Sequence, residues 1–162
     1  MFSADLLTRA EKLLADARAK NLKIASAESC TGGLIAGLLT EIAGSSDVFE
    51  RGFVTYSNEA KLELLGVPLA LLAQHGAVSQ EVARAMAQGA LSHSHADLAV
   101  AVTGVAGPGG GSTEKPVGLV HIAAARKGGD ILHRECHFGD IGRGAVRIAT
   151  VGVALEMLSA LA

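Results

Sequence analysis

Hydrophobic positions repeat with helical spacing over much of the chain. Near the N-terminus the apolar residues recur every three or four positions, at Leu6, Leu7, Ala10, Leu13, Leu14 and Ala17, which predicts an amphipathic helix. Gly66-Val67-Pro68 marks the end of a short helix, and Ser79 is suited to begin another. The predicted helices cover the segment with these apolar positions, 6–17, and residues 34–42, 58–65, 79–93 and 143–161.

Apolar runs of strand length lie between these helices. Strands are predicted over residues 22–27, 52–56, 97–103 and 117–125, and the run over 97–103 has the composition of a buried central strand. Gly128-Gly129-Asp130 predicts a hairpin turn into a last strand that alternates Leu132, Arg134, Cys136 and Phe138 with His133, Glu135 and His137. Strands alternating with helices, with one late hairpin, predict an α/β fold: a three-layer α/β/α single domain over residues 1–162 with a mixed, mostly parallel sheet.

Composition and charge narrow the class of protein. Hydrophobic residues form 49% of the 162 residues and charged residues 19%, which is typical of a globular domain. A net charge of −2 and 3% aromatic residues leave neither a basic groove nor stacking platforms, so we expect no nucleic-acid partner. No apolar stretch reaches the ~20 residues of a membrane span, and we expect no membrane partner. Two cysteines and no signal-peptide pattern indicate a reduced, cytoplasmic compartment.

The turn Glu28-Ser29-Cys30-Thr31-Gly32-Gly33 joins the first strand to a helix. Ser29 lies where an N-cap residue would lie, and capping alone would stabilise the helix by about 1 kcal/mol. The functional alternative makes Ser29 a nucleophile, with the amides of Cys30, Thr31 and Gly32 stabilising an oxyanion. Gly32 and Gly33 would let a substrate approach the backbone. Cys30 is a rival nucleophile, and the sequence leaves that choice open.

A serine nucleophile needs a base, and the strand ends suggest one. Ligands bind beyond the carboxyl ends of strands in open α/β sheets, and Lys61 follows the second strand in Tyr56-Ser57-Asn58-Glu59-Ala60-Lys61. To act near pH 7, Lys61 would need its pKa to fall by about 3 units from ~10.4, which burial away from carboxylates could cause. The alternative is a solvated lysine. Tyr56 could orient the serine or relay its proton, or could simply pack at the strand end.

Two further features could bind an anion. The loop 103–111, Thr103 to Gly111, could hold a phosphate or sugar with its amides, although it lacks the Gly-Lys-Ser/Thr of a P-loop. Arg143 and Arg147, four residues apart, could clamp an anion or form an exposed basic face. His133, Glu135 and His137 could suggest a metal site, but polar alternation on an exposed strand explains them better. We therefore expect no metal and no cofactor.

Four motifs together resemble the CinA C-terminal domain family over nearly the whole chain. They are Ala27-Glu28-Ser29-Cys30-Thr31-Gly32-Gly33, Tyr56-Ser57-Asn58 with Lys61, Val102-Thr103-Gly104-Val105-Ala106-Gly107-Pro108 and Lys115-Pro116-Val117-Gly118.

This resemblance implies a nicotinamide-nucleotide amidase of pyridine nucleotide salvage, which converts nicotinamide mononucleotide and water to nicotinate mononucleotide and ammonia. It implies a metal-independent mechanism with Ser29, Lys61 and nearby Tyr56. The expected substrate-binding positions are Glu28, Cys30, Thr31, Gly32, Gly33, Thr103, Gly104, Gly107, Arg143 and Arg147. The alternative is a non-catalytic nucleotide-binding or regulatory module of the competence-damage-inducible type. Ala-rich helix faces are compatible with a homo-oligomer.

Overall fold

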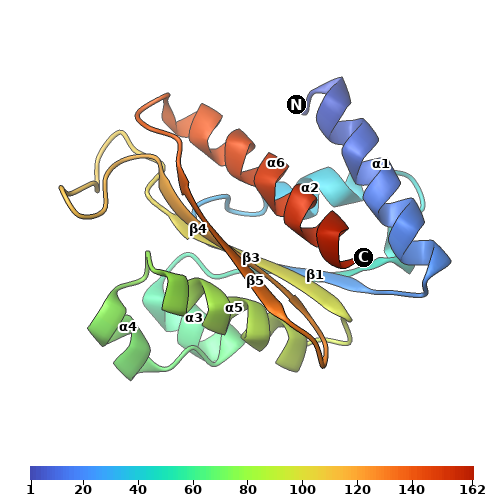
Figure 1. The fold of residues 1–162 in the computed structure, drawn as a ribbon, viewed down its shortest axis with the longest axis horizontal. Coiled ribbons are helices and arrows are strands. Elements are labelled where there is room, and N and C mark those ends of the chain that lie inside the picture. Colours follow the sequence, from blue (N-terminus) through green and yellow to red (C-terminus); the bar gives the residue numbers. More distant parts are fainter.

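Five strands form one sheet with helices on both of its faces in the computed structural model, which describes residues 1–162 (Figure 1). The strands lie in the order β2-β1-β3-β4-β5. Their bounds are β1 Ile24–Glu28, β2 Phe49–Val54, β3 Leu98–Gly104, β4 Leu119–Arg126 and β5 Ile131–His137. The helices are α1 Ala4–Ala19, α2 Leu34–Thr40, α3 Asn58–Leu65, α4 Leu69–His75, α5 Gln80–Ser92 and α6 Arg143–Leu161, with a short 3₁₀ helix, η1, at Ser45–Asp47.

Strand direction changes midway across the sheet. β1 pairs in parallel with both β2 and β3, whereas β3 with β4 and β4 with β5 pair antiparallel. The α/β class and the mixed sheet are thus confirmed, but the sheet is not mostly parallel. The reason lies in the connection over residues 105–118, which contains no helix. Because a parallel return needs a long crossover, this loop brings β4 back antiparallel beside β3.

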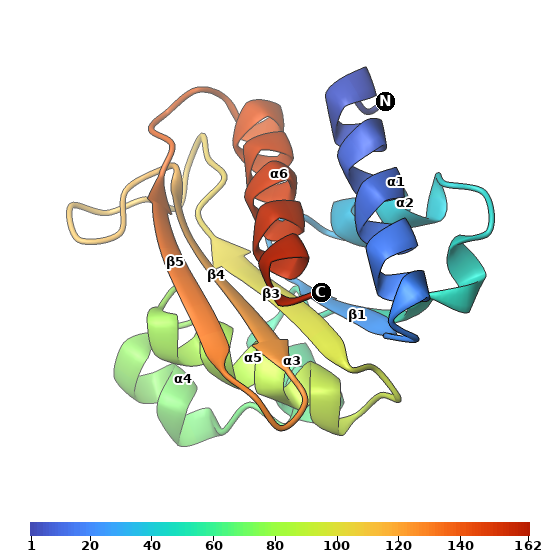
Figure 2. The same ribbon diagram turned by 45° about the vertical axis from the view of Figure 1, so that its right-hand side comes forward.

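The two faces of the sheet carry side chains of different size. On the face covered by α1, α2 and α6, the strands contribute large aliphatic residues such as Ile24, Val100 and Ile122. On the face covered by α3, α4 and α5, they contribute alanines: Ala25, Ala27, Ala99, Ala101, Ala123 and Ala125. Figure 2 shows the two helical layers on either side of the strands. The alanines allow α5 to lie close against the sheet, and α3 packs against α5.

All five predicted helices are present, and the largest difference in a boundary is that of β2. α3 and α6 begin and end where the spacing predicts, while β2 begins three residues before the predicted strand and ends two residues before its end. β2 is an edge strand whose residues are half-buried or exposed, so its apolar pattern is weak. Helix α4 was not predicted, because only Leu72 among its residues is buried.

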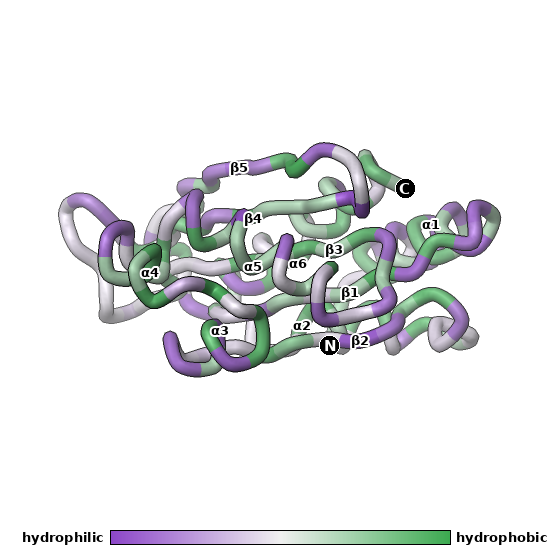
Figure 3. Tube along the Cα trace, turned by 90° about the horizontal axis from the view of Figure 1, so that it is seen from below, coloured by the Kyte–Doolittle hydropathy of each residue, from purple (hydrophilic) through white to green (hydrophobic).

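Helix α6 departs from the expectation about apolar stretches. It is 19 residues long and, by length and composition alone, could cross a membrane. In this structure it lies against β3, β4 and α1, and Val151, Leu155 and Leu158 belong to the larger core. Apolar residues of α6 thus contribute to the larger core. In α1, hydrophilic and hydrophobic positions alternate along the helix (Figure 3).

Candidate active site

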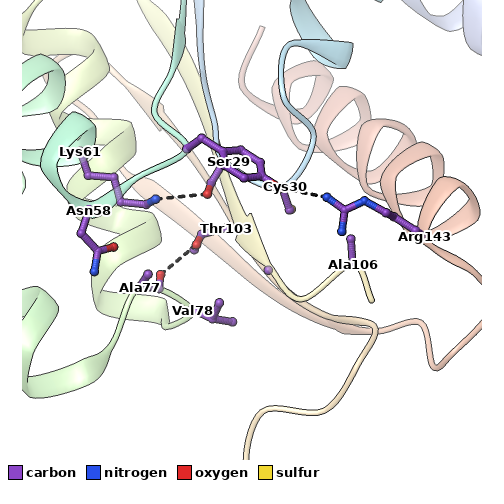
Figure 4. Close-up of a pocket in the computed structure, with 11 residues that line it drawn as sticks. Ser29, Cys30, Asn58, Lys61, Ala77, Val78, Thr103, Ala106 and Arg143 are labelled. Carbon is purple, nitrogen blue, oxygen red and sulfur yellow. Dashed lines mark hydrogen bonds between the residues drawn. The ribbon is translucent and has the colours of Figure 1, made fainter. Parts of the chain in front are cut away.

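A pocket of about 220 Å³ opens at the carboxyl ends of β1 and β3, where the strand-end argument places a ligand. Segments from β1, β3, α3, the α4–α5 connection and the start of α6 form its walls (Figure 4). No carboxylate is among its lining residues, which are Ser29, Cys30, Tyr56, Asn58, Lys61, Ala77, Val78, Thr103, Gly104, Ala106 and Arg143.

Ser29 and Lys61 meet in this pocket although they are 32 residues apart. The Lys61 Nζ lies 3.1 Å from the Ser29 Oγ and donates a hydrogen bond of 2.9 Å to the Thr55 carbonyl oxygen. β1 delivers Ser29, whose amide donates to Val102 of β3. α3 delivers Lys61 from one turn inside a helix capped by Ser57, whose hydroxyl accepts from the Ala60 amide. The distance is that of a nucleophile and its base.

The surroundings of Lys61 favour its neutral form. Its side chain is 1% exposed, and no carboxylate contacts the amine. Burial lowers the pKa of Lys61 below its usual range, and only the neighbouring Cys30 acts weakly in the other direction. A depressed pKa increases the fraction of amine able to accept a proton at neutral pH.

Cys30 borders the same pocket but differs in environment. It is 5% exposed and its side chain belongs to the larger core. Burial is the main cause that raises the pKa of the Cys30 thiol to about 11, and the Glu28 carboxylate adds to the effect. Since the thiolate is the reactive form, this cysteine is a poor nucleophile and Ser29 is favoured over it.

The turn after β1 differs from the expected helix start. α2 begins at Leu34 after the left-handed Gly33, so Ser29 does not cap it. The Gly32 amide donates to the Ser29 carbonyl oxygen and is therefore unavailable to a substrate. The amides of Cys30 and Thr31 donate to no oxygen of the protein. Of the three amides predicted to face an oxyanion, these two remain free.

Several predicted substrate-binding positions lie outside the pocket. Glu28 and Thr31 are fully buried, and the Thr31 hydroxyl donates to the Glu28 carboxylate at 2.7 Å. Both side chains are enclosed within the turn and do not line the pocket. Gly32 and Gly33 also lie in this turn without lining the pocket.

The two arginines of α6 have different positions. Arg143 lines the pocket and donates to the Gly107 carbonyl oxygen and to the Tyr56 hydroxyl, each at 2.8 Å. Arg147 lies behind the turn and donates to the carbonyl oxygens of Cys30 and Thr31, at 3.1 and 2.9 Å. Only Arg143 can therefore reach a ligand in the pocket, and Arg147 supports the turn instead.

Tyr56 lies at the mouth of the pocket with 61% of its surface exposed. Its hydroxyl is bonded to Arg143 and makes no hydrogen bond to Ser29. The expectation that it orients the serine is thus not met in this arrangement, and its ring forms part of the wall.

The glycine loop, residues 103–111, forms part of the pocket wall. Thr103 and Gly104 line the pocket, and the Thr103 hydroxyl donates to the Ala77 carbonyl oxygen at 2.8 Å. Gly107 is buried against Val117, does not line the pocket, and offers its carbonyl oxygen to Arg143.

Four lining residues were not among the predicted site residues. Asn58 follows β2 in the quoted Tyr56-Ser57-Asn58 motif, so its position beside a strand end was an available signal. Ala106 lies in the quoted glycine loop. Ala77 and Val78 come from the α4–α5 connection, and apolar residues in a loop gave no signal.

The histidines of the late hairpin lie away from this pocket. His121 and His133 are joined by a hydrogen bond of 3.0 Å between ring nitrogens, and His137 pairs with Glu135 at 2.7 Å. No group of three or more His, Cys, Asp or Glu side chains is placed to hold a metal ion.

The class of protein is thus a three-layer α/β/α domain with a mixed sheet, in which a serine and a buried lysine are in contact beyond the carboxyl ends of the parallel strands. The chain belongs to the CinA C-terminal domain family, whose profile matches residues 7–162.

Two relatives of known name or structure match nearly the whole chain, and a third matches about two thirds of it. Nicotinamide-nucleotide amidohydrolase PncC of Escherichia coli is 50% identical over 98% of this chain and 95% of its own. A competence/damage inducible protein of Agrobacterium tumefaciens, CihA, has a crystal structure that superimposes with a TM-score of 0.98, with 57% identity, 99% coverage of this chain and 98% of its own. A competence-damage inducible protein of Caldicellulosiruptor bescii is 64% identical over 67% of this chain, which spans 26% of that longer relative.

Proposed function

We propose that this protein is a nicotinamide-nucleotide amidase, which hydrolyses the carboxamide of nicotinamide mononucleotide to nicotinate mononucleotide and ammonia. The observation that carries the proposal is the 3.1 Å approach of a buried lysine amine to a serine hydroxyl. The named activity of the half-identical E. coli relative supplies the substrate class. Two free, buried cysteines accord with a cytoplasmic enzyme.

In the proposed reaction, the neutral Lys61 amine accepts the proton of the Ser29 hydroxyl as its oxygen attacks the carboxamide carbon. The tetrahedral intermediate collapses when Lys61 returns that proton to the leaving nitrogen, which departs as ammonia. A water then attacks the acyl-enzyme ester, giving a proton to Lys61 that passes back to the Ser29 oxygen. The products are the free acid and the regenerated pair.

The free amides of Cys30 and Thr31 are the donors we assign to the oxyanion. They follow the nucleophile directly, and they have no acceptor in the protein. Arg147 bonds the carbonyl oxygen of the peptide that carries the Thr31 amide, and the Gly32 amide bonds that of the peptide that carries the Cys30 amide. Donors fixed before the reaction stabilise a developing charge without reorganisation, and losing one such donor typically costs about 10²–10³-fold in kcat.

We expect the rest of the nucleotide to lie outside the pocket, on the grounds of size and charge. Its 220 Å³ is below the roughly 300–1,000 Å³ of sites for drug-sized ligands, so it suits the pyridine ring and its carboxamide. Arg143 at the mouth is the charged group we assign to the phosphate, and binding there would replace its bonds to Tyr56 and Gly107.

The direct test is ammonia release from nicotinamide mononucleotide by the purified protein. Ser29→Ala and Lys61→Ala should both lose turnover while unfolding at nearly the wild-type temperature. Lys61→Arg should stay inactive, because a guanidinium cannot give up its proton. Turnover in Ser29→Ala at the wild-type rate would refute the serine role.

A non-catalytic nucleotide-binding module would give a different result. It would bind nicotinamide mononucleotide in calorimetry but release no ammonia at enzyme concentrations where the E. coli relative is active. Treatment with iodoacetamide distinguishes a serine nucleophile from a cysteine nucleophile. It should leave the activity intact, because the buried Cys30 thiol is protonated at pH 8.

A further inference from the structure

Glu28 is the residue with the most hydrogen bonds around the turn, yet it does not face the pocket. It ends β1, directly before Ser29, and its side chain is fully buried. Its carboxylate accepts five hydrogen bonds of 2.7–3.1 Å, from the hydroxyls of Ser26 and Thr31 and from the amides of Gly33, Ile35 and Ala36.

These bonds tie the end of β1 to the beginning of α2. Gly33 provides no side-chain cap, and the first turn of α2 contains no acidic residue. The orphan amides and the positive end of this helix are therefore satisfied from outside it, by Glu28. The residues between, 29–32, form a short closed turn held at both ends.

The same hydrogen bonds determine which backbone amides near Ser29 remain free to bind a substrate. Glu28 occupies those of Gly33, Ile35 and Ala36, while the Gly32 amide donates to the Ser29 carbonyl oxygen. The carboxylate thus satisfies amides at the beginning of α2. With it, only Cys30 and Thr31 have free amides in the turn.

We infer that Glu28 is a positioning residue: its buried carboxylate fixes the turn so that the Ser29 hydroxyl and the free amides of Cys30 and Thr31 act on the same carbonyl group. The inference rests on the proposed function for its substrate. Glu28 itself touches no reacting atom.

Glu28→Gln tests this with little change of shape. The glutamine amide presents N–H donors where backbone amides also donate, so the turn loses at least one bond and shifts. We expect kcat for ammonia release to fall by about 100-fold, the cost of a displaced catalytic group. Affinity for nicotinamide mononucleotide, measured by calorimetry in the Ser29→Ala background with and without Glu28→Gln, should change less than about threefold. The matched control is Glu41→Gln, the same substitution at an exposed residue after α2, which should keep the wild-type kcat.

A purely structural role predicts another pattern. If Glu28 only stabilised the fold, kcat per folded molecule, measured well below the midpoint of thermal unfolding, would equal that of the wild type, and this would overturn the inference. An equal loss of kcat and of substrate affinity would also overturn it.

A second readout does not depend on the substrate. A fluorophosphonate phosphonylates active serines and also places an oxygen between the free amides of Cys30 and Thr31. Mass spectrometry follows its addition to Ser29. We expect a slower reaction in Glu28→Gln than in the wild type, even if nicotinamide mononucleotide proves not to be the substrate. Equal rates would overturn the positioning role alone, and a wild-type serine that resists the reagent would overturn both proposals.

Discussion

At the residue scale, the proposed reaction depends on one lysine whose environment is unusual. Lys61 is buried among residues that exclude water and include no carboxylate, and this burial lowers its pKa. The acid side of the activity profile should report this group, because only the neutral amine accepts the serine proton. We expect kcat/KM for ammonia release to fall about tenfold per pH unit below the Lys61 pKa, with the midpoint below the ~10.4 of an unperturbed lysine.

Asn58→Asp provides a directional check on this assignment. Asn58 lies one helical turn before Lys61 and lines the same pocket. A carboxylate there would stabilise the protonated amine, so the midpoint of kcat/KM against pH should move to higher pH. A profile that stays unchanged in Asn58→Asp would assign the acid side to another group.

Gly104 shows how little space surrounds the pocket wall. A Cβ at this position would lie 2.7 Å from a Val120 methyl and 2.8 Å from the Leu119 carbonyl oxygen. Gly104→Ala should therefore lower the free energy of unfolding, measured by urea denaturation, by about 1–3 kcal/mol. Gly109→Ala in the same loop is the control, because its Cβ would meet no atom within 4 Å, and it should unfold at the wild-type midpoint or slightly above.

At the element scale, the contact between α3 and α5 sets the position of Lys61. Gly89 of α5 lies so close to the Leu65 carbonyl of α3 that a Cβ would overlap it. In an isolated helix Gly89→Ala would be stabilising by up to about 1 kcal/mol. Here we expect destabilisation by at least about 1–3 kcal/mol in urea denaturation, with a fall in kcat because α3 must move.

Gly144→Ala in α6 is the matched substitution for that experiment. It also replaces a helical glycine, but its Cβ would meet no atom within 4 Å. We expect stability to rise by up to about 1 kcal/mol. If both alanine variants gained stability, the close contact between α3 and α5 would be contradicted.

At the scale of the whole molecule, the paired histidines make stability depend on pH. Burial lowers the pKa of both His121 and His133, and His121 also opposes protonation of His133. Glu135 and Glu81 act in favour of the protonated forms, whereas Arg84 and Lys115 act against them. The unfolded chain binds protons at about pH 6.5, before the folded pair does, so acid favours unfolding.

The contribution of this histidine pair to the free energy of unfolding should therefore be highest above about pH 6.5. It should decline as the pH falls through the lowered pKa of the folded histidines. Urea midpoints at pH 7.5, 6.0 and 5.0 measure it, and a variant with His121→Asn and His133→Asn should lose part of the decline. Identical pH dependence in the two proteins would contradict this.

The sequence by itself determined the elements and the residues worth testing. The bounds of α3 and α6 follow from helical spacing, because periodicity is a local property of the chain. The buried strand near Val100 follows from its apolar composition. The strand-end rule also indicated that Ser29 and Lys61 would lie on one edge of the sheet, since parallel strands end on the same side.

Only the tertiary structure decided how those residues meet. Burial, which depends on neighbours far along the chain, disfavours Cys30 as a nucleophile and lowers the pKa of Lys61. Packing directs the Glu28 carboxylate toward the turn after β1 and away from the pocket. It also brings Ala77, from the α4–α5 connection, to the pocket wall. Distances and desolvation arise between segments remote in sequence, and no local pattern encodes them.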